Sequence, residues 1–381
     1  MKKKRWRVRF LSLLLLGICM AAHLWLVCLG TRTLPEGVEL SGEEELRLTR
    51  MQTDALETAK RYSFVITDLI SIDSILAEGD FAGKEFADRN LYVEAWYTDS
   101  GFGRHSGLTL AEGTWPATGD PEEFSQTVAI SEDLAQTLFL RTDDVTGEML
   151  QIHGKSYRIC GVYEENESLP ARMSEGRFDR IFLPYTDYEA AENVWPVKYL
   201  YDWESTARFP EKLSQELGTV LAQELPVLQT VDFAEYKALI AQTFRLALFV
   251  GGALLEAVLA ARLWRFAFDG RHPLRKQGIG MGWRIGYVAG LLALMGLLAA
   301  VIAFPVTIPA DYAPAENIFD VGWYLDVLVA GRQSENSRLI YSLYQGYAGR
   351  LLWLCIGSLA VEVMGMLQAA LVWLGSRSEG R

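Results

Sequence analysis

The chain has 381 residues, of which 50% are hydrophobic and 22% are charged, and its formal net charge is -12. A mean hydropathy of +0.10 is high for a chain with so many charges. This indicates apolar blocks separated by polar ones and excludes a single soluble core. The acidic balance argues against a nucleic-acid partner.

Four apolar blocks stand out, covering residues 10–30, 243–263, 285–308 and 351–374. Each has about the 20 residues that a helix needs to cross a bilayer. The first is longer than the apolar part of a cleaved signal peptide and no small-x-small site follows it, so we expect it to stay as an anchor. The sequence predicts an α-helical membrane protein with four transmembrane helices and a large extracytoplasmic α+β domain between helices 1 and 2.

The distribution of Lys and Arg predicts the orientation. Six basic residues precede the first block and six follow the second, whereas segment 31–242 has about twice as many carboxylates as basic residues. We therefore expect a multi-pass protein of the cell membrane with both termini cytoplasmic. The predicted parts are the basic N-terminus with helix 1 (1–30), the extracytoplasmic domain (31–242), helix 2 (243–264), a cytoplasmic loop (265–284), helix 3 (285–308), an extracytoplasmic loop (309–350) and helix 4 with a cytoplasmic tail (351–381).

The extracytoplasmic segment alternates helix and strand patterns. A capping box at Ser41-Gly-Glu-Glu44 predicts a helix that runs to about Lys60. The glycine-rich stretch 101–107 is expected to be a flexible connector. Ser131 is placed to cap a helix, and His153-Gly154 to join two strands of a hairpin. Further strands are expected at 63–70, 91–98, 180–184 and 197–203, and a further helix at 210–224.

No pattern in the chain predicts catalysis. Gly154-Lys155-Ser156 would need a glycine at position 149 to be a phosphate loop, and that residue is Met. Neither a nucleophile elbow nor zinc-ligand spacing is present. Three of the four cysteines lie in predicted spans, which leaves no disulfide framework. We expect a protein that is not an enzyme, with no catalytic residues, cofactor or metal.

Polar residues inside predicted spans are costly and need a reason. His23, Glu256 and Glu362 are such residues. The two glutamates fit either an ion or proton relay or inward packing between helices, and the lack of a third acidic residue favours packing. Gly282, Gly286 and Gly290 continue a four-residue glycine spacing from Gly278, which predicts a face for close helix packing.

The stretch Val128–Glu165 resembles the end of the extracytoplasmic core domain of MacB/FtsX-type ABC transporter permeases. Its helix "VAISEDLAQTLF" is similar to the family pattern V-A-I-S-x-x-L-A-x-x-L-F, and the following strands fit G-x-x-L-x-I-x-G-x-x-Y-x-I-x-G-V. The order of one span, an outer domain and three spans is also the family's. The matching residues are Ala129, Leu134, Leu138, Phe139, Gly147, Ile152, Gly154, Tyr157, Gly161 and Val162.

The resemblance implies a permease subunit that works with a separate ABC ATPase, with a second permease that is identical or similar, and with membrane lipid. ATP-driven motion of the spans would be transmitted to the outer domain. The ATPase-coupling loop implied for the family would here contain Arg271, Arg275, Lys276 and Gly278, although the acidic residue of the family pattern is missing. The alternative is a membrane-anchored sensor or scaffold that binds a ligand or partner outside the cell without an ATPase.

The segment 309–350 is long for that family and contains two aromatic stretches, Trp323-Tyr324-Leu325 and Tyr341–Tyr347. Aromatic residues of this kind rest at a membrane interface or pack beneath the outer domain. The sequence leaves both open.

Overall fold

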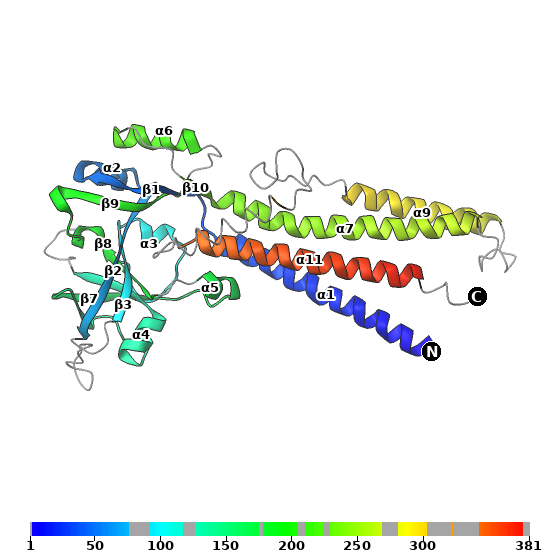
Figure 1. Cartoon of the computed structure of the whole chain (residues 1–381), viewed down its shortest axis with the longest axis horizontal. Helices are drawn as coiled ribbons and strands as arrows, with labels where there is room; N and C mark the ends of the chain where they lie inside the picture. The colour runs from blue at the N-terminus through cyan, green and yellow to red at the C-terminus, as the bar shows by residue number, and fades with distance from the viewer. Residues whose placement is uncertain are drawn as a thin grey trace. The chain divides into compact units, whose positions relative to one another are not determined.

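The computed structural model describes residues 2–75, 91–116, 126–174, 178–204, 210–223, 229–268, 281–302, 322 and 343–375. The chain divides into two compact units, which we describe separately. The outer unit contains residues 32–236 and 325–350, and the helical unit contains residues 1–31, 237–324 and 351–381. Figure 1 shows the strands gathered in the outer unit.

The outer unit is built on one ten-stranded sheet of order β10-β1-β9-β2-β3-β8-β5-β7-β4. Strand β6 pairs with both β2 and β7, so β2, β3, β8, β5, β7 and β6 form a closed ring of paired strands. The pairs β3–β8 and β5–β7 are parallel and the others are antiparallel. The strands are β1 (Val38–Thr49), β2 (Tyr62–Ile75), β3 (Leu91–Thr98), β4 (Leu110–Gly113), β5 (Thr127–Ser131), β6 (Met149–Ile152), β7 (Lys155–Tyr163), β8 (Arg180–Pro184), β9 (Val194–Asp202) and β10 (Gln229–Asp232).

Short helices connect the strands and cover the sheet. Helices α2 and α6 lie side by side (Figure 1), and α4 contacts β5 and β7. The helices of the outer unit are α2 (Arg50–Ala59), α3 (Phe102–His105), α4 (Glu132–Phe139), α5 (Leu169–Ser174) and α6 (Pro210–Leu221), with 3-10 turns at Tyr185–Asp187 and Ala191–Asn193.

Two local predictions are confirmed. The Ser131 hydroxyl accepts a hydrogen bond from the Leu134 amide and caps α4. His153 and Gly154 both have positive φ, 49° and 74°, as a two-residue hairpin turn between β6 and β7 requires.

The predicted helix from Ser41 to Lys60 is wrong in its first half. Residues 38–49 form β1, and the capping box is made by Thr49 and Gln52 at the start of α2. Leu40 and Leu48 are buried in strand positions, and the register shift between Ser41 and Leu46 accommodates the acidic run. Strand pairing on both sides therefore overrides the local helix pattern.

The connector expected at 101–107 is also more ordered than predicted. It contains α3, a single turn whose Phe102 side chain is fully buried. The glycines on either side of Phe102 allow this turn to pack closely, since a Cβ at Gly103 would lie 2.3 Å from the Trp115 ring.

The strands send alternate side chains to two cores. The main core is mostly aliphatic and receives residues such as Phe64 and Ile66 from β2, and it is covered by α2, α4 and α6. A second core, which we call the aromatic cluster, receives Val65 from β2 and Trp96 from β3. Its buried members are Val65, Trp96, Phe102, Ala129, Tyr163, Phe182, Tyr199, Tyr201, Trp203, Val231, Phe233 and Tyr344.

The helical unit is formed by parts of four long helices: α1 (Lys2–Thr33), α7 (Phe233–Phe268), α9 (Met281–Ile302) and α11 (Gln345–Gly375). Among the described residues, three segments are long and apolar enough to span a membrane, at Leu14–Thr33, Phe233–Ala261 and Gln345–Leu371. Helix α9 has a shorter apolar stretch, Ile285–Ala299. Three candidate spans thus flank the outer domain.

Candidate functional site

Three long helices have an end in the outer unit, and the residues at these ends meet around the aromatic cluster. Thr33 ends α1, Phe233 begins α7, and Tyr344 directly precedes α11. Phe233 is fully buried and Tyr344 is 5% exposed, both among rings contributed by the end of β9. We call this place the junction.

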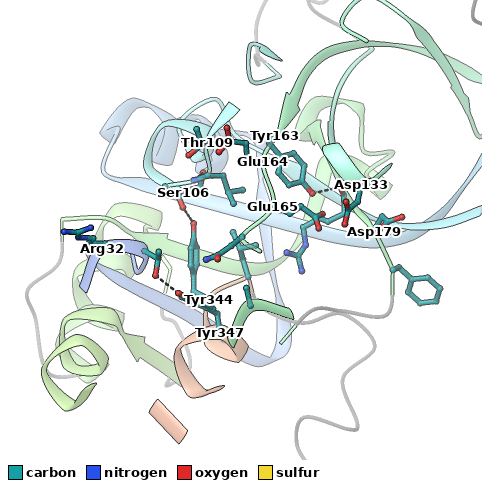
Figure 2. A pocket seen from close by; sticks show the side chains of 18 residues that line it. Arg32, Ser106, Thr109, Asp133, Tyr163, Glu164, Glu165, Asp179, Tyr344 and Tyr347 are labelled. Atoms are coloured by element: carbon teal, nitrogen blue, oxygen red, sulfur yellow. Dashed lines mark hydrogen bonds between the residues drawn. The ribbon is translucent and has the colours of Figure 1, made fainter. Parts of the chain in front are cut away.

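Tyr344 is the central residue of the junction. Its ring lies edge-on to three others, with centroids 5.2 Å from Phe233, 6.0 Å from Tyr201 and 6.5 Å from Trp203. Figure 2 shows its hydroxyl directed at Ser106, whose backbone carbonyl accepts its hydrogen bond. Burial raises the pKa of Tyr344 well above the usual tyrosine value, so the hydroxyl stays a donor.

The other helix ends are joined by hydrogen bonds. The hydroxyls of Tyr347 and Thr33 are 2.6 Å apart, which connects the first turn of α11 to the last of α1. The backbone amide of Phe233 donates to the carbonyl of Gly37 over 3.2 Å. Gly37 has a φ of +97°, and a Cβ there would lie 2.1 Å from the carbonyl oxygen of Asp202. The position therefore requires glycine.

A two-pronged ion pair supports the end of β9 beside Gly37. Arg61 donates from Nε and Nη2 to the two carboxylate oxygens of Asp202, each over 2.6 Å. Asp202 is 1% exposed, so its charge depends on this partner. The same hydrogen bonds raise the pKa of Arg61 above its usual range.

A cavity of about 510 Å³ lies beside Tyr344 within the outer unit. Figure 2 shows Asp133, Glu165 and Asp179 near the buried ring of Tyr163 on the side away from Tyr344. Burial, followed by the charge of Asp133, raises the pKa of Asp179. Its charged lining residues are Arg32, Asp133, Glu164, Glu165, Asp179 and Arg180.

Arg180 is already engaged by the protein. It forms an ion pair with the fully buried Glu94 over 3.2 Å, and its guanidinium stands 4.3 Å above the Trp96 ring. Burial raises the pKa of Glu94 and the charge of Arg180 opposes this rise. The cavity lining therefore has a surplus of carboxylates.

The arrangement is suited to holding helix ends and a solute, and shows no reactive centre. In the part of the chain that the structure describes, no group of three or more His, Cys, Asp or Glu side chains is placed to hold a metal ion. The junction residues are aromatic rings, hydroxyls and backbone groups, which bind and position rather than react.

The residues predicted for ATPase coupling, Arg271, Arg275, Lys276 and Gly278, lie outside the described residues. Gly282, Gly286 and Gly290 lie in α9. Among the described atoms, nothing lies within 4 Å of a Cβ built at any of these three glycines. Close helix packing at this face stays a prediction.

Two of the three polar residues expected inside the spans are in contact. His23 Nδ1 lies 3.0 Å from a carboxylate oxygen of Glu362, and Nε2 lies 2.9 Å from the Thr243 hydroxyl. Glu256 is 13 positions beyond Thr243 on α7, about 20 Å along the helix axis. Sequence reasoning missed Thr243, because a lone threonine in an apolar helix gives no signal. It named the stretch around Tyr344 without deciding where it packs.

Comparison with known proteins identifies the outer domain. A family model for the MacB-like periplasmic core domain matches residues 38–214. The outer domain of this chain is a MacB-like periplasmic core domain. The predicted resemblance to MacB/FtsX-type ABC transporter permeases is thereby confirmed.

Two solved structures of MacB-like domains were also found. The periplasmic region of MacB from Actinobacillus actinomycetemcomitans is 11% identical, with a TM-score of 0.35 over 52% of this chain and 89% of that chain. The extracellular domain of the noncanonic ABC-type transporter YknZ from Gram-positive bacteria is 13% identical, with a TM-score of 0.35 over 51% of this chain and 98% of that chain. A search of curated proteins gave no match.

Proposed function

We propose that this chain is the permease subunit of an ABC-type transporter or mechanotransmission complex. A separate ATPase binds on the cytoplasmic side and hydrolyses ATP, and the resulting movement of the helices reaches the MacB-like domain through the junction. The chain itself carries out no catalysis. A second permease, identical or similar, completes the complex in the membrane.

The observation that carries this proposal is the burial of Tyr344 in the aromatic cluster of a MacB-like domain. Any displacement at the start of α11 must either move Tyr344 with its ring contacts or expose them to water. Burial of a large aromatic side chain stabilises by roughly 3 kcal/mol, so moving the contacts together costs less than separating them. The hydrogen bond between Tyr347 and Thr33 joins α1 to the same displacement.

The membrane arrangement belongs to the same proposal. It has four transmembrane helices, with α9 and the residues that follow it forming the third, and both termini are cytoplasmic. The loop 265–284 then faces the cytoplasm and presents Arg275, Lys276 and Gly278 to the ATPase.

Co-purification tests the proposal. The full chain is extracted from its native membrane in mild detergent, and its bound proteins are identified for the wild type and for an Arg275→Glu, Lys276→Glu variant. An Arg377→Glu variant, which changes a basic residue of the tail, is the matched control. We expect a P-loop ATPase with the wild type and the control, and its loss from the loop variant. A wild type purified without any ATPase contradicts the proposal.

A second function, a membrane-anchored sensor or scaffold without an ATPase, is favoured by one observation. The acidic cavity beside Tyr344 has room for a small cationic or polar solute. Recovery of a partner of the outer surface, with no ATPase in the preparation, supports this function over the first.

A further inference from the structure

Three buried polar side chains from three different helices meet in the helical unit. His23 of α1 and Glu362 of α11 are fully buried, and Thr243 of α7 is 8% exposed. His23 lies between the other two, with Nδ1 3.0 Å from Glu362 Oε2 and Nε2 2.9 Å from Thr243 Oγ1. All three helices contain a candidate membrane span.

The hydrogen-bond directions determine how many protons the group holds. The Thr243 hydroxyl donates to the backbone carbonyl of Ile240 over 2.6 Å. Since that proton is used, Thr243 can only accept from His23, and Nε2 must carry a hydrogen. His23 Nδ1 and Glu362 Oε2 then need one proton between them, on the nitrogen or on the oxygen.

One shared proton also gives the buried group a net charge of zero, whether it is an ion pair or a neutral pair. Without the proton, two lone pairs face each other and the site carries a negative charge. With a second proton, the site carries a positive charge. Either charge is costly in an apolar interior.

We propose that His23, Thr243 and Glu362 form a proton-binding latch, which holds one proton while it joins α1, α7 and α11. Opening the latch to water exposes a histidine and a glutamate with ordinary pKa values, about 6.5 and about 4.3. Between these values the open pair also holds one proton, on the histidine. Above about pH 6.5 the open pair holds none, so opening releases the proton.

The sign of the pH dependence follows from this count. Above about pH 6.5 the closed state binds one more proton than the open state, so a rise in pH favours opening, tenfold for each pH unit. Below about pH 4.3 the open state binds the extra proton, and a fall in pH favours opening. The latch is strongest between these limits. This inference does not depend on an ATPase partner.

Few other titratable groups face the latch from the three helices. The Cys355 thiol of α11 is fully buried and interacts with Thr243. Cys19 lies one turn before His23 on α1 and is half-buried, and Arg245 of α7 is exposed. The Phe244 ring closes one side, edge-on to His23 at 5.5 Å between centroids.

Glu362→Gln separates the proton from the hydrogen bonds. The glutamine amide can donate to Nδ1, so the contacts remain while the exchangeable proton is lost. The purified full chain is unfolded with sodium dodecyl sulfate between pH 6.5 and 8.5, as wild type and as variant. We expect the wild-type unfolding constant to rise relative to the variant by up to 100-fold over this range. Parallel pH curves for the two proteins overturn the proposal.

Glu256→Gln is the matched control, because it changes another glutamate of the spans outside the latch, and it is expected to keep the wild-type pH slope. A second measurement uses the wild type alone, in case the variant does not fold. The sequence has only four histidines, so ¹⁵N-histidine labelling gives few signals, and substituting the other three in turn assigns His23. We expect the His23 signals to stay constant between pH 5 and 8. A titration of His23 near pH 6.5 overturns the proposal.

Discussion

The main core and the aromatic cluster of the outer domain are built from opposite sides of the same strands, yet they differ in composition and in what they contact. The main core is mostly Leu, Ile and Val, and short helices that begin and end within the domain cover it. Nine of the twelve members of the aromatic cluster are aromatic, and two of them, Phe233 and Tyr344, lie at the ends of long helices. The main core stabilises the fold, and the aromatic cluster attaches the helices.

Aromatic side chains suit this second role for a physical reason. They bury a large apolar area with few rotatable bonds, and tyrosine keeps a polar group at its tip. At the junction, Tyr344 uses its ring against Tyr201 and Trp203 and its hydroxyl against the Ser106 carbonyl. A leucine at this position would offer burial without direction.

The largest effect is expected where the junction leaves no space. Gly37→Ala places a Cβ 2.1 Å from the Asp202 carbonyl, and its φ of +97° is itself unfavourable. We expect a loss of at least about 4 kcal/mol in the free energy of unfolding, measured by denaturant titration of the full chain. Gly147→Ala is the matched control, because its φ is +98° but nothing lies within 4 Å of the new Cβ. It should cost about 1–2 kcal/mol. Equal losses would show that φ alone requires the glycine, and not the close approach to β9.

Two truncations test the division of roles directly. Leu56→Ala in the main core and Tyr344→Ala in the aromatic cluster should each cost about 3–5 kcal/mol, since both side chains are buried. Hydrogen exchange distinguishes them. We expect Tyr344→Ala to increase exchange in the first turns of α11 and around Ser106, with the main core unchanged, and Leu56→Ala to do the reverse. The same pattern from both variants contradicts separate roles.

Asp99 lies between the two cores and predicts a pH dependence. One carboxylate oxygen accepts from the Phe64 amide in the main core, and the other from Gly101, next to Phe102 of the aromatic cluster. Burial raises its pKa to about 7, so the folded state keeps a proton that the unfolded state loses above about pH 4. Stability contributed at low pH is therefore lost as pH rises from about 4 to 7, by up to about 4 kcal/mol.

Unfolding of the full chain at several pH values measures this effect. Asp99→Asn has no proton to lose, so the difference between wild type and variant isolates the carboxyl group. An outer domain whose stability, relative to the Asn variant, rises from pH 5 to 7 contradicts the expected loss.

The smallest effect is expected from the hydroxyl of Tyr344. Tyr344→Phe keeps the ring and removes the hydrogen bond to the Ser106 carbonyl, which should cost about 1 kcal/mol. Thermal unfolding measures the loss, and Tyr185→Phe in the main core is a control for removing a buried tyrosine hydroxyl. If Tyr344→Phe had the full effect of Tyr344→Ala, the hydrogen bond and not the ring packing would attach the helix.

Much of the outer domain was predictable where local pattern and tertiary packing agree. The Ser131 cap and the His153-Gly154 turn depend on short-range geometry, and the structure confirms both. The segment 38–49 was mispredicted because its pairing partners are β9 and β10, more than 140 residues away in the sequence. No local signal could have overcome the capping pattern.

The site was predictable only in part, for the same reason. His23 and Glu362 were noticeable because charges are rare in apolar helices, but their pairing joins the two ends of the chain. Tyr344 was one tyrosine among several in an aromatic stretch. Its role depends on Phe233 and Tyr201, which only the folded domain brings to it.

Hydrogen exchange in the purified complex, with and without ATP, tests the central claim most directly. If ATP-driven helix movement passes through the junction, ATP should change exchange in the first turns of α11 and in residues 102–106 together. The change in residues 102–106 should disappear in Tyr344→Ala, while that in α11 persists. Exchange at residues 102–106 that is the same with and without ATP, or that responds to ATP equally in wild type and variant, would contradict transmission through the junction.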